Sequence, residues 1–231
     1  VADADRLTFD QICHEDSPAT RELVPAFLAG VDYQSPTLDH QRVIEAILAA
    51  ARFGLAGTRS DIERALEAGL GLREFVPLPI YGRLLRALYH TGGDASFRVL
   101  EALWKQLMAT EPSLADSDEI RSFNQRAAAI AAAQLMMRPD DRGTNARFHE
   151  RARHYLGLRE AGEADLIGMS YLIDAVDEAS LSGHEDILRA FARNRARLLD
   201  DDLEKTRERM RRRARTTLER ALAGFPPTPP A

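Results

Sequence analysis

Residues 81–100, YGRLLRALYHTGGDASFRVL, decide the fold that we expect for this chain. Leu84, Leu85 and Leu88 recur at the spacing of one helix face, and Gly92-Gly93 supplies a turn. A second apolar face of helical spacing follows the turn, through Phe97, Leu100, Leu103, Trp104 and Leu107. The stretch therefore predicts a helical hairpin whose two apolar faces are buried together.

The same pattern returns along the chain with other residues. A ring marks each of four segments in which two helical patterns flank a turn: His40, Tyr81, Phe123 and Tyr171. These rings are 41, 42 and 48 residues apart, and we expect each near the start of an amphipathic helix. Repeats on this scale are typical of stacked helical arrays, which bind partners through their surfaces. We therefore expect an all-α fold, an array of about four helical hairpins with a long charged C-terminal helix and extended termini.

The composition of the chain agrees with a helical protein that has a core. Hydrophobic residues make up 45% of the 231 residues and charged residues 29%, and the chain is rich in Ala, Leu, Arg and Glu, which are good helix formers. Segments of alternating Val, Ile and Thr are absent, so we expect no sheet. No run of 18 apolar residues exists, so we expect no membrane span.

Changes in composition divide the chain into four segments. An acidic N-terminal extension covers residues 1–36, with one short helix near Ala19–Ala29, and the hairpin domain covers residues 37–199. A charged C-terminal helix covers residues 200–223, and a proline-rich tail covers residues 224–231.

Local signals mark where the helices of the hairpin domain begin and how closely they pack. Ser60-Asp61-Ile62-Glu63 has the spacing of a capping box at a helix N-terminus. Thr144 or Asn145 is expected to cap a later helix. The alanine run Ala127–Ala133 predicts the close approach of a neighbouring helix.

Two hairpins carry a resemblance to a known family. Tyr81–Gly93 followed by Phe97–Leu100 is similar to the aromatic-rich first helix, glycine turn and apolar second helix of pentatricopeptide-type (PPR) repeats. Tyr171–Ala175 with Gly183 resembles that unit again. The resemblance covers about residues 37–199 and implies a degenerate PPR-like α-solenoid. Tetratricopeptide repeats and plain helical bundles share most of these features.

The chain departs from the base-reading members of that family. Its units are longer and less even, and the positions that would read RNA bases hold Gln41, Gly82, Asn124 and Leu172. Asn124 alone fits well, because glycine and leucine side chains cannot hydrogen-bond a base edge. With a net charge of −5, these residues favour protein contacts over RNA contacts.

The resemblance also implies a cellular role. Members of this family are overwhelmingly organellar, and degenerate members serve as accessory subunits of mitochondrial assemblies, including ribosomes and the F1 head of euglenozoan ATP synthase. We therefore expect a non-catalytic scaffolding subunit of a large mitochondrial complex on the matrix side, with ATP synthase as the most specific expectation. The start at Val1 fits either a removed presequence or a trimmed chain. The alternative is a PPR-type RNA-binding or mitochondrial ribosome-associated protein.

A run of arginines near the C-terminus is the strongest local charge signal. Residues 205–215 carry seven bases against Glu208, although the chain as a whole is acidic. The candidate residues for docking onto protein subunits of a larger assembly are Arg207, Arg209, Arg211, Arg212, Arg213 and Arg215. The alternatives are a solvated helix face, or contact with RNA or anionic lipid.

The residues that could carry chemistry do not form a recognisable set. His149 and His154 have an i, i+5 spacing, which places them off a common helix face and differs from the zinc motif of two histidines at i, i+4. Cys13 and His14 are adjacent, and adjacent side chains rarely point at each other. We therefore expect no enzyme activity, no catalytic residues, no cofactor and no metal site.

Overall fold

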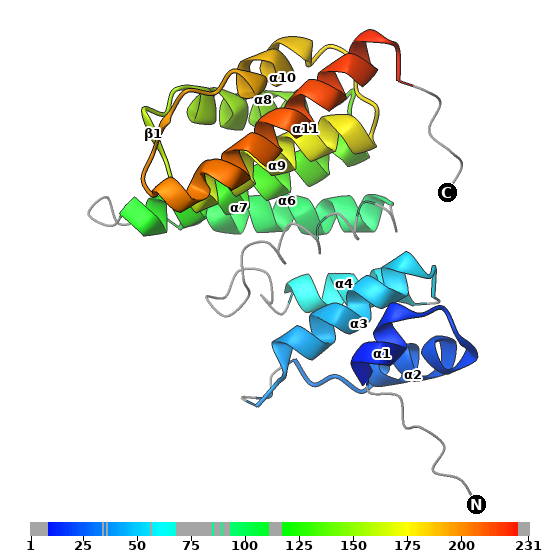
Figure 1. Ribbon diagram of the computed structural model, residues 1–231. Coiled ribbons are helices and arrows are strands. Elements are labelled where there is room, and N and C mark those ends of the chain that lie inside the picture. Colours follow the sequence, from blue (N-terminus) through cyan, green and yellow to red (C-terminus); the bar gives the residue numbers. More distant parts are fainter. Residues whose placement is uncertain are drawn as a thin grey trace, which may run out of the picture. The chain divides into compact units, whose positions relative to one another are not determined.

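The computed structural model describes residues 9–33, 35, 37–55, 57–67, 85, 89, 93–110 and 117–225. Most of these residues lie in helices, so the all-α fold class expected from the sequence is confirmed (Figure 1). The chain forms two compact units, Val1–Val99 and Leu100–Ala231. Residues 37–199, which we expected as one repeat domain, are divided between the two units.

The first unit begins with helices that the sequence foresaw only in part. Its described helices before the unit boundary are α1 (Phe9–His14), α2 (Pro18–Ala29), α3 (His40–Arg52) and α4 (Thr58–Glu67). The short helix expected near Ala19–Ala29 is α2, whereas α1 was not expected. The Ser17 hydroxyl caps α2 by accepting the Thr20 amide at 3.1 Å, and the buried Thr20 hydroxyl donates to the Ile12 carbonyl at 2.8 Å. The second of these bonds ties α2 to α1.

The turn between α3 and α4 corrects one prediction. The apolar face of α3 is buried, at Val43, Ile44, Ile47 and Leu48. Gly54 and Gly57 then adopt φ values of +60° and +82°, which favour glycine. The chain is thereby turned so that α4 begins at Thr58, and the Ser60 hydroxyl donates backwards to the Gly57 carbonyl at 2.8 Å. The expected Ser60 capping box is therefore wrong.

The second unit contains most of the described long helices. The boundary falls within α6 (Asp94–Ala109), which is followed by α7 (Ser117–Met137), α8 (Arg142–Leu156), α9 (Glu163–Glu178), α10 (Glu185–Ala192) and α11 (Glu204–Leu222). Helix α7 packs against α8 and α9, α11 crosses over α9, and α10 packs against α8 and α11 (Figure 1). The C-terminal helix expected over residues 200–223 is the 3-10 turn η1 (Asp201–Leu203) followed by α11.

The alanine run of α7 permits the close helix packing that the sequence predicted. All residues of Ala127–Ala133 are buried, and α9 is the helix that packs most extensively against α7. Helix α9 presents a buried apolar face of Leu166, Met169, Leu172, Ile173 and Val176. Small side chains on one helix let the larger side chains of the next fill the space between them.

A short strand pair corrects the expectation of no sheet. Strands β1 (Glu160–Ala161) and β2 (Arg197–Leu198) are parallel, with Glu160 opposite Arg197 and Ala161 opposite Leu198. Strand β1 follows α8, and β2 follows α10. The pair therefore joins the connection between α8 and α9 to the connection that follows α10, and its partnered residues are 37 positions apart (197 − 160).

Two further expectations are wrong in detail: the residue that caps α8 and the positions of the rings. Helix α8 is capped by Asp141, whose carboxylate accepts the Thr144 amide at 2.8 Å, so the cap expected at Thr144 or Asn145 is wrong. His40 opens α3, but Phe123 and Tyr171 lie in the interior of α7 and α9, so the rings do not mark equivalent positions.

Half of the hairpin of residues 81–100 lies outside the described residues. Leu85, Leu100 and Trp104 are each buried, as expected, whereas Leu84 and Leu88 lie outside the described residues. The same holds for residues 226–231 of the tail. Within the described part of the chain, no helix combines the length and the apolar character needed to cross a membrane.

Candidate docking surface

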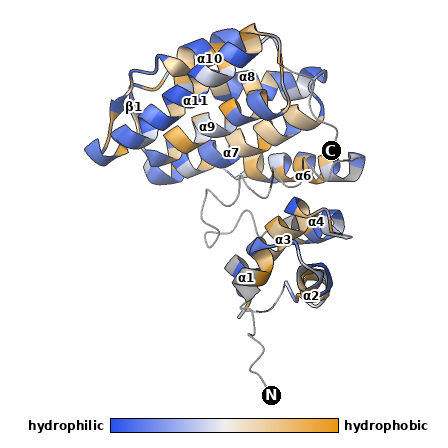
Figure 2. Cartoon of the chain, turned by 45° about the vertical axis from the view of Figure 1, so that its right-hand side comes forward, coloured by the Kyte–Doolittle hydropathy of each residue, from blue (hydrophilic) through white to orange (hydrophobic). Residues whose placement is uncertain are grey.

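Helix α11 has one buried side and one charged outer side. Met210, Ala214 and Thr217 are buried. Arg209, Arg212 and Arg215 are spaced by three residues, so they lie within a sector of about 120° on the side opposite those three residues. We call these three residues the arginine face. The helix is hydrophilic along most of its length (Figure 2).

Two other arginines of the run point inward and hydrogen-bond α11 to the segment between α10 and β2. The Arg207 guanidinium donates to the Ala196 carbonyl at 3.1 Å and pairs with Glu204. The Arg211 Nε donates to the Asn194 carbonyl at 3.0 Å, and its guanidinium pairs with Glu208 at 2.6 Å. Both carbonyls lie in the segment between α10 and β2, so these arginines hold that segment against α11.

A second pair of arginines joins α11 to α9. Arg213 Nε lies 2.6 Å from an Asp174 carboxylate oxygen, and Arg220 pairs with Asp177. Asp174 is largely buried, with 14% of its side chain exposed, while Arg213 is 46% exposed. Asp177 is thus an ion-pair partner of the C-terminal helix.

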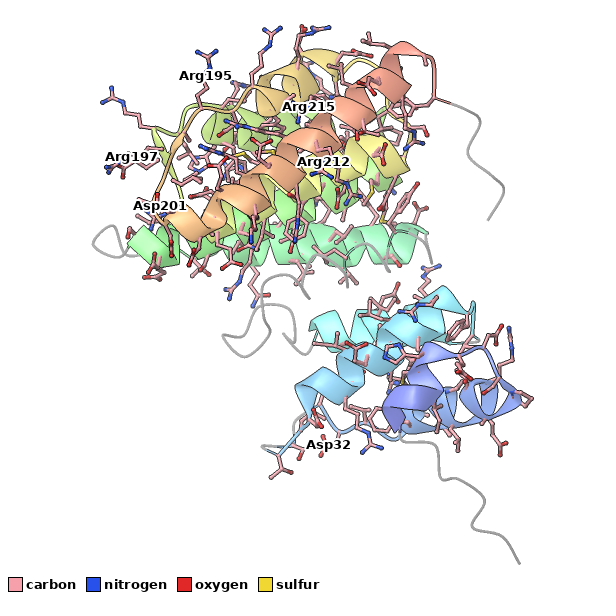
Figure 3. All side chains as sticks on the ribbon, in the orientation of Figure 1. Asp32, Arg195, Arg197, Asp201, Arg212 and Arg215 are labelled. Carbon is pink, nitrogen blue, oxygen red and sulfur yellow. The ribbon has the colours of Figure 1, made fainter. Side chains whose placement is uncertain are left out.

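The arginine face itself makes few hydrogen bonds or ion pairs with the described residues. Arg209 and Arg212 are exposed, and neither has a hydrogen-bond or ion-pair partner among the described residues. Arg215 is 55% exposed and lies 3.8 Å from Glu208. The hydrogen bond from Arg211, together with nearby Arg215 and Arg207, lowers the pKa of Glu208, so that carboxylate is already engaged. Figure 3 shows Arg212 and Arg215 extending from α11.

Two more arginines stand beside the helix. Arg195 lies between the two residues whose carbonyls accept from Arg211 and Arg207, and it is exposed. Arg197 in β2 pairs with Glu160, yet 76% of its side chain is exposed. Both side chains extend away from the helices (Figure 3). The segment that α11 holds in place therefore adds exposed positive charge to the same part of the unit.

The candidate chemical residues do not converge. The His149 ring stacks near His184, whereas the His154 ring contacts Tyr155. Cys13 is buried in α1, and His14 beside it is exposed. Among the residues that the structure describes, no group of three or more His, Cys, Asp or Glu side chains is placed to hold a metal ion.

Two of the four positions that would read RNA bases are described, and the side chains at both are buried in the protein. Asn124 is buried, donates to the Ile120 carbonyl at 2.9 Å and accepts from Arg151 at 3.1 Å. Leu172 is fully buried. The side chain of Gln41 and all of Gly82 lie outside the described residues. Neither Asn124 nor Leu172 can therefore meet a base without a rearrangement of the core.

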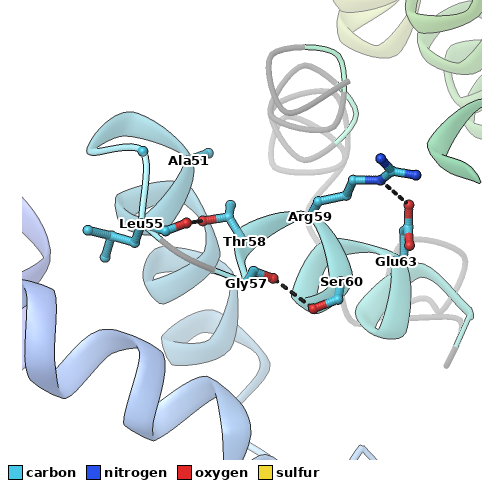
Figure 4. A pocket seen from close by; sticks show the side chains of 8 residues that line it. Ala51, Leu55, Gly57, Thr58, Arg59, Ser60 and Glu63 are labelled. Atoms are coloured by element: carbon cyan, nitrogen blue, oxygen red, sulfur yellow. Dashed lines mark hydrogen bonds and ion pairs between the residues drawn. The ribbon is translucent and has the colours of Figure 1, made fainter. Parts of the chain in front are cut away.

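An open pocket of about 570 Å³ lies in the first unit at the turn between α3 and α4 (Figure 4). Its lining consists of Ala51, Gly54, Leu55, Gly57, Thr58, Arg59, Ser60 and Glu63. The polar groups of this lining bond to one another: Thr58 donates to the Leu55 carbonyl at 2.5 Å, and Arg59 pairs with Glu63 at 3.0 Å. The pocket therefore has few polar groups that are free to bind a ligand.

Sequence reasoning found the arginine run but not its division into two sets. The signal was present, because Arg207 and Arg211 flank Met210 and Ala214 on the apolar side of the helix, while Arg209 and Arg212 do not. The backbone carbonyls that accept from Arg207 and Arg211 could not be read from the sequence, since they belong to a connection of unknown path.

Comparison with known proteins assigns neither a family nor a function to the chain. A scan against protein-family models, a search of curated proteins and a search of solved structures each found no match. The resemblance to PPR repeats therefore stays a prediction from the sequence.

Proposed function

We propose that this chain is a non-catalytic accessory subunit of a larger protein assembly, and that it docks onto an acidic protein surface through the arginine face. The observation that carries the proposal is the division of the arginines. Arg207, Arg211 and Arg213 bond to groups of the second unit, whereas Arg209 and Arg212 are exposed without a partner among the described residues.

The physical chemistry of arginine favours a carboxylate-rich partner. A guanidinium presents its donors in a planar fork that matches a carboxylate, so each exposed arginine can form two parallel hydrogen bonds. An exposed pair contributes only about 0–1 kcal/mol, so docking needs several pairs formed together and partial exclusion of water. Such binding weakens as salt rises, because exposed charges are screened.

Binding of RNA by the helical array is the runner-up, and the structure supports it less. Sequence-selective reading needs exposed polar side chains at the base-facing positions. Asn124 is buried, and both the nitrogen and the oxygen of its side-chain amide are hydrogen-bonded within the chain. The exposed arginines could still meet phosphates, so the experiment below separates RNA from protein. The placement in a mitochondrial complex, with ATP synthase first and the ribosome next, rests on the sequence resemblance alone.

The test is a comparison of matched charge-reversal variants. The variant Arg209→Glu/Arg212→Glu reverses the charge of the two residues of the arginine face that have no hydrogen-bond or ion-pair partner among the described residues. The control Arg98→Glu/Arg142→Glu makes the same change of charge at exposed arginines on α6 and α8. Each tagged chain is expressed in its native organism, recovered at moderate salt with and without nuclease, and its partners are quantified by mass spectrometry.

We expect wild type and control to be recovered with the same protein subunits, and the Arg209→Glu/Arg212→Glu variant to lose them. Recovery of all three chains as free monomers would refute the role as an accessory subunit. Loss of wild-type partners on nuclease treatment would favour the RNA-binding alternative.

A further inference from the structure

Two histidines meet where α8 contacts the start of α10. The ring centroids of His149 and His184 are 5.4 Å apart, with the ring planes at 36°. Phe148 packs its edge against the His184 ring at 5.0 Å. His184 is only 7% exposed, and within the described part of the chain its Nδ1 atom is buried without a hydrogen-bond partner. The imidazoles therefore form a largely apolar contact.

This contact suits neutral rings and does not suit charged ones. Burial lowers the pKa of both histidines, and their mutual repulsion lowers that of His184 further. His184 also immediately precedes α10, where the positive end of the helix dipole opposes an imidazolium. Among described residues, Arg153 on α8 adds to the lowering at His149, and Glu185 on α10 opposes it at His184.

We propose that His149 and His184 form an acid-sensitive latch between α8 and α10, which regulates the arginine face. The regulatory part of this inference rests on the proposed docking function. Protonation of either ring places a charge in a contact built from Phe148 and a second imidazole, so α10 is released from α8 as the pH falls. We call the two histidines the imidazole latch.

The latch reaches the arginine face through α10 and the segment that follows it. Helix α10 packs against α11, and Arg211 and Arg207 of α11 donate to the Asn194 and Ala196 carbonyls directly after α10. Release of α10 therefore loosens the groups that fix α11. The latch makes docking weaker in acid, whereas added positive charge alone would make binding to an acidic partner stronger.

The direction of the pH effect follows from proton linkage. Because both folded-state pKa values lie below the ordinary imidazole value of about 6.5, the unfolded chain binds more protons once the pH falls below that value. The stability that these two groups contribute is complete above about pH 6.5 and is lost as the pH falls through the folded-state pKa values.

The latch is tested on the whole chain by NMR titration of the histidine rings and by hydrogen exchange of α10. We expect His184 to titrate below the ordinary range, and His149→Gln to raise its pKa by removing the neighbouring imidazole. His154→Gln, on the same helix but outside the pair, should leave the His184 titration unchanged. Hydrogen exchange should be compared at about pH 7.5 and about pH 5.5, which bracket the ordinary imidazole pKa. After correction for intrinsic exchange rates, the α10 amides should exchange faster, relative to those of α9, at the lower pH.

The coupling to docking is tested with polyaspartate as the acidic probe. We expect wild type to bind it more weakly at about pH 5.5 than at about pH 7.5, and His149→Gln/His184→Gln to lose that decrease. If the double variant fails to fold, polyaspartate binding by His149→Gln alone gives the answer, because its decrease in acid should be smaller than that of wild type. An ordinary pKa for His184, or equal α10 protection at both pH values, would overturn the latch. If polyaspartate does not bind, or if Arg209→Glu/Arg212→Glu does not change its binding, the docking function and its regulation are overturned. The latch itself is judged separately, by the NMR result.

Discussion

At the scale of single residues, position on the helix decides what each arginine of α11 does. Arg211 and Arg212 are neighbours in the sequence, yet about 100° of helical rotation separates them. Arg211 reaches the Asn194 carbonyl, while Arg212 is exposed without a partner among the described residues. The same residue type thus serves folding at one position and is available for binding at the next.

This difference predicts that alanine substitutions at Arg211 and Arg212 affect different properties. Arg211→Ala should lower the free energy of unfolding by about 1–3 kcal/mol, because it leaves the Asn194 carbonyl without its charged donor. Arg212→Ala should leave stability unchanged and weaken partner recovery. Urea denaturation of both variants checks the first effect, and equal loss of stability in the two would contradict the division into inward and outward arginines.

At the scale of elements, α8 and α9 approach each other through a glycine. A Cβ atom on Gly168 of α9 would overlap the hydroxyl oxygen of Tyr155 and lie 2.5 Å from its Cζ atom. Tyr155 is fully buried, so it has little room to move away. The absence of a side chain at Gly168 therefore sets the spacing of the two helices.

Gly168→Ala should accordingly destabilise the second unit by about 1–3 kcal/mol, the usual cost of overpacking a core. Tyr155→Phe removes the nearest atom, so it should restore part of the loss in the double variant. Gly157→Ala is the matched control, since its Cβ would lie at an ordinary 3.4 Å from the Arg153 carbonyl oxygen. Thermal unfolding of the four chains measures these effects, and a Gly168→Ala variant as stable as wild type would refute the packing argument.

At this scale the sequence predicted the helices better than their ends. The apolar face of Phe97, Leu100 and Trp104 and the alanine run of α7 were recognised because their spacing is local. The starts of α4 and α8 were misplaced, because Thr58 and Asp141 owe their roles to the preceding turns. The β1–β2 pair could not be foreseen, since it joins residues that lie 37 positions apart and carry no strand pattern.

At the scale of the whole molecule, the chain forms two compact units, and their boundary falls inside residues 37–199, the segment that we expected as a repeat domain. Each unit is described by itself, and the docking proposal and the imidazole latch both lie within the second. The arginine run was visible in the sequence, whereas the His149–His184 pair was not, because α8 and α10 are brought together only by the fold. The PPR-like array and the mitochondrial role stay predictions.

The central claim is that the arginine face is covered by an acidic protein surface in the assembled state. Arginine footprinting with phenylglyoxal tests it most directly, applied to the native assembly and to the isolated chain and read by mass spectrometry. We predict that Arg209, Arg212 and Arg215 react in the isolated chain and are protected in the assembly, with or without nuclease, while Arg142 reacts in both. Equal reaction of the three arginines in both states would contradict the account.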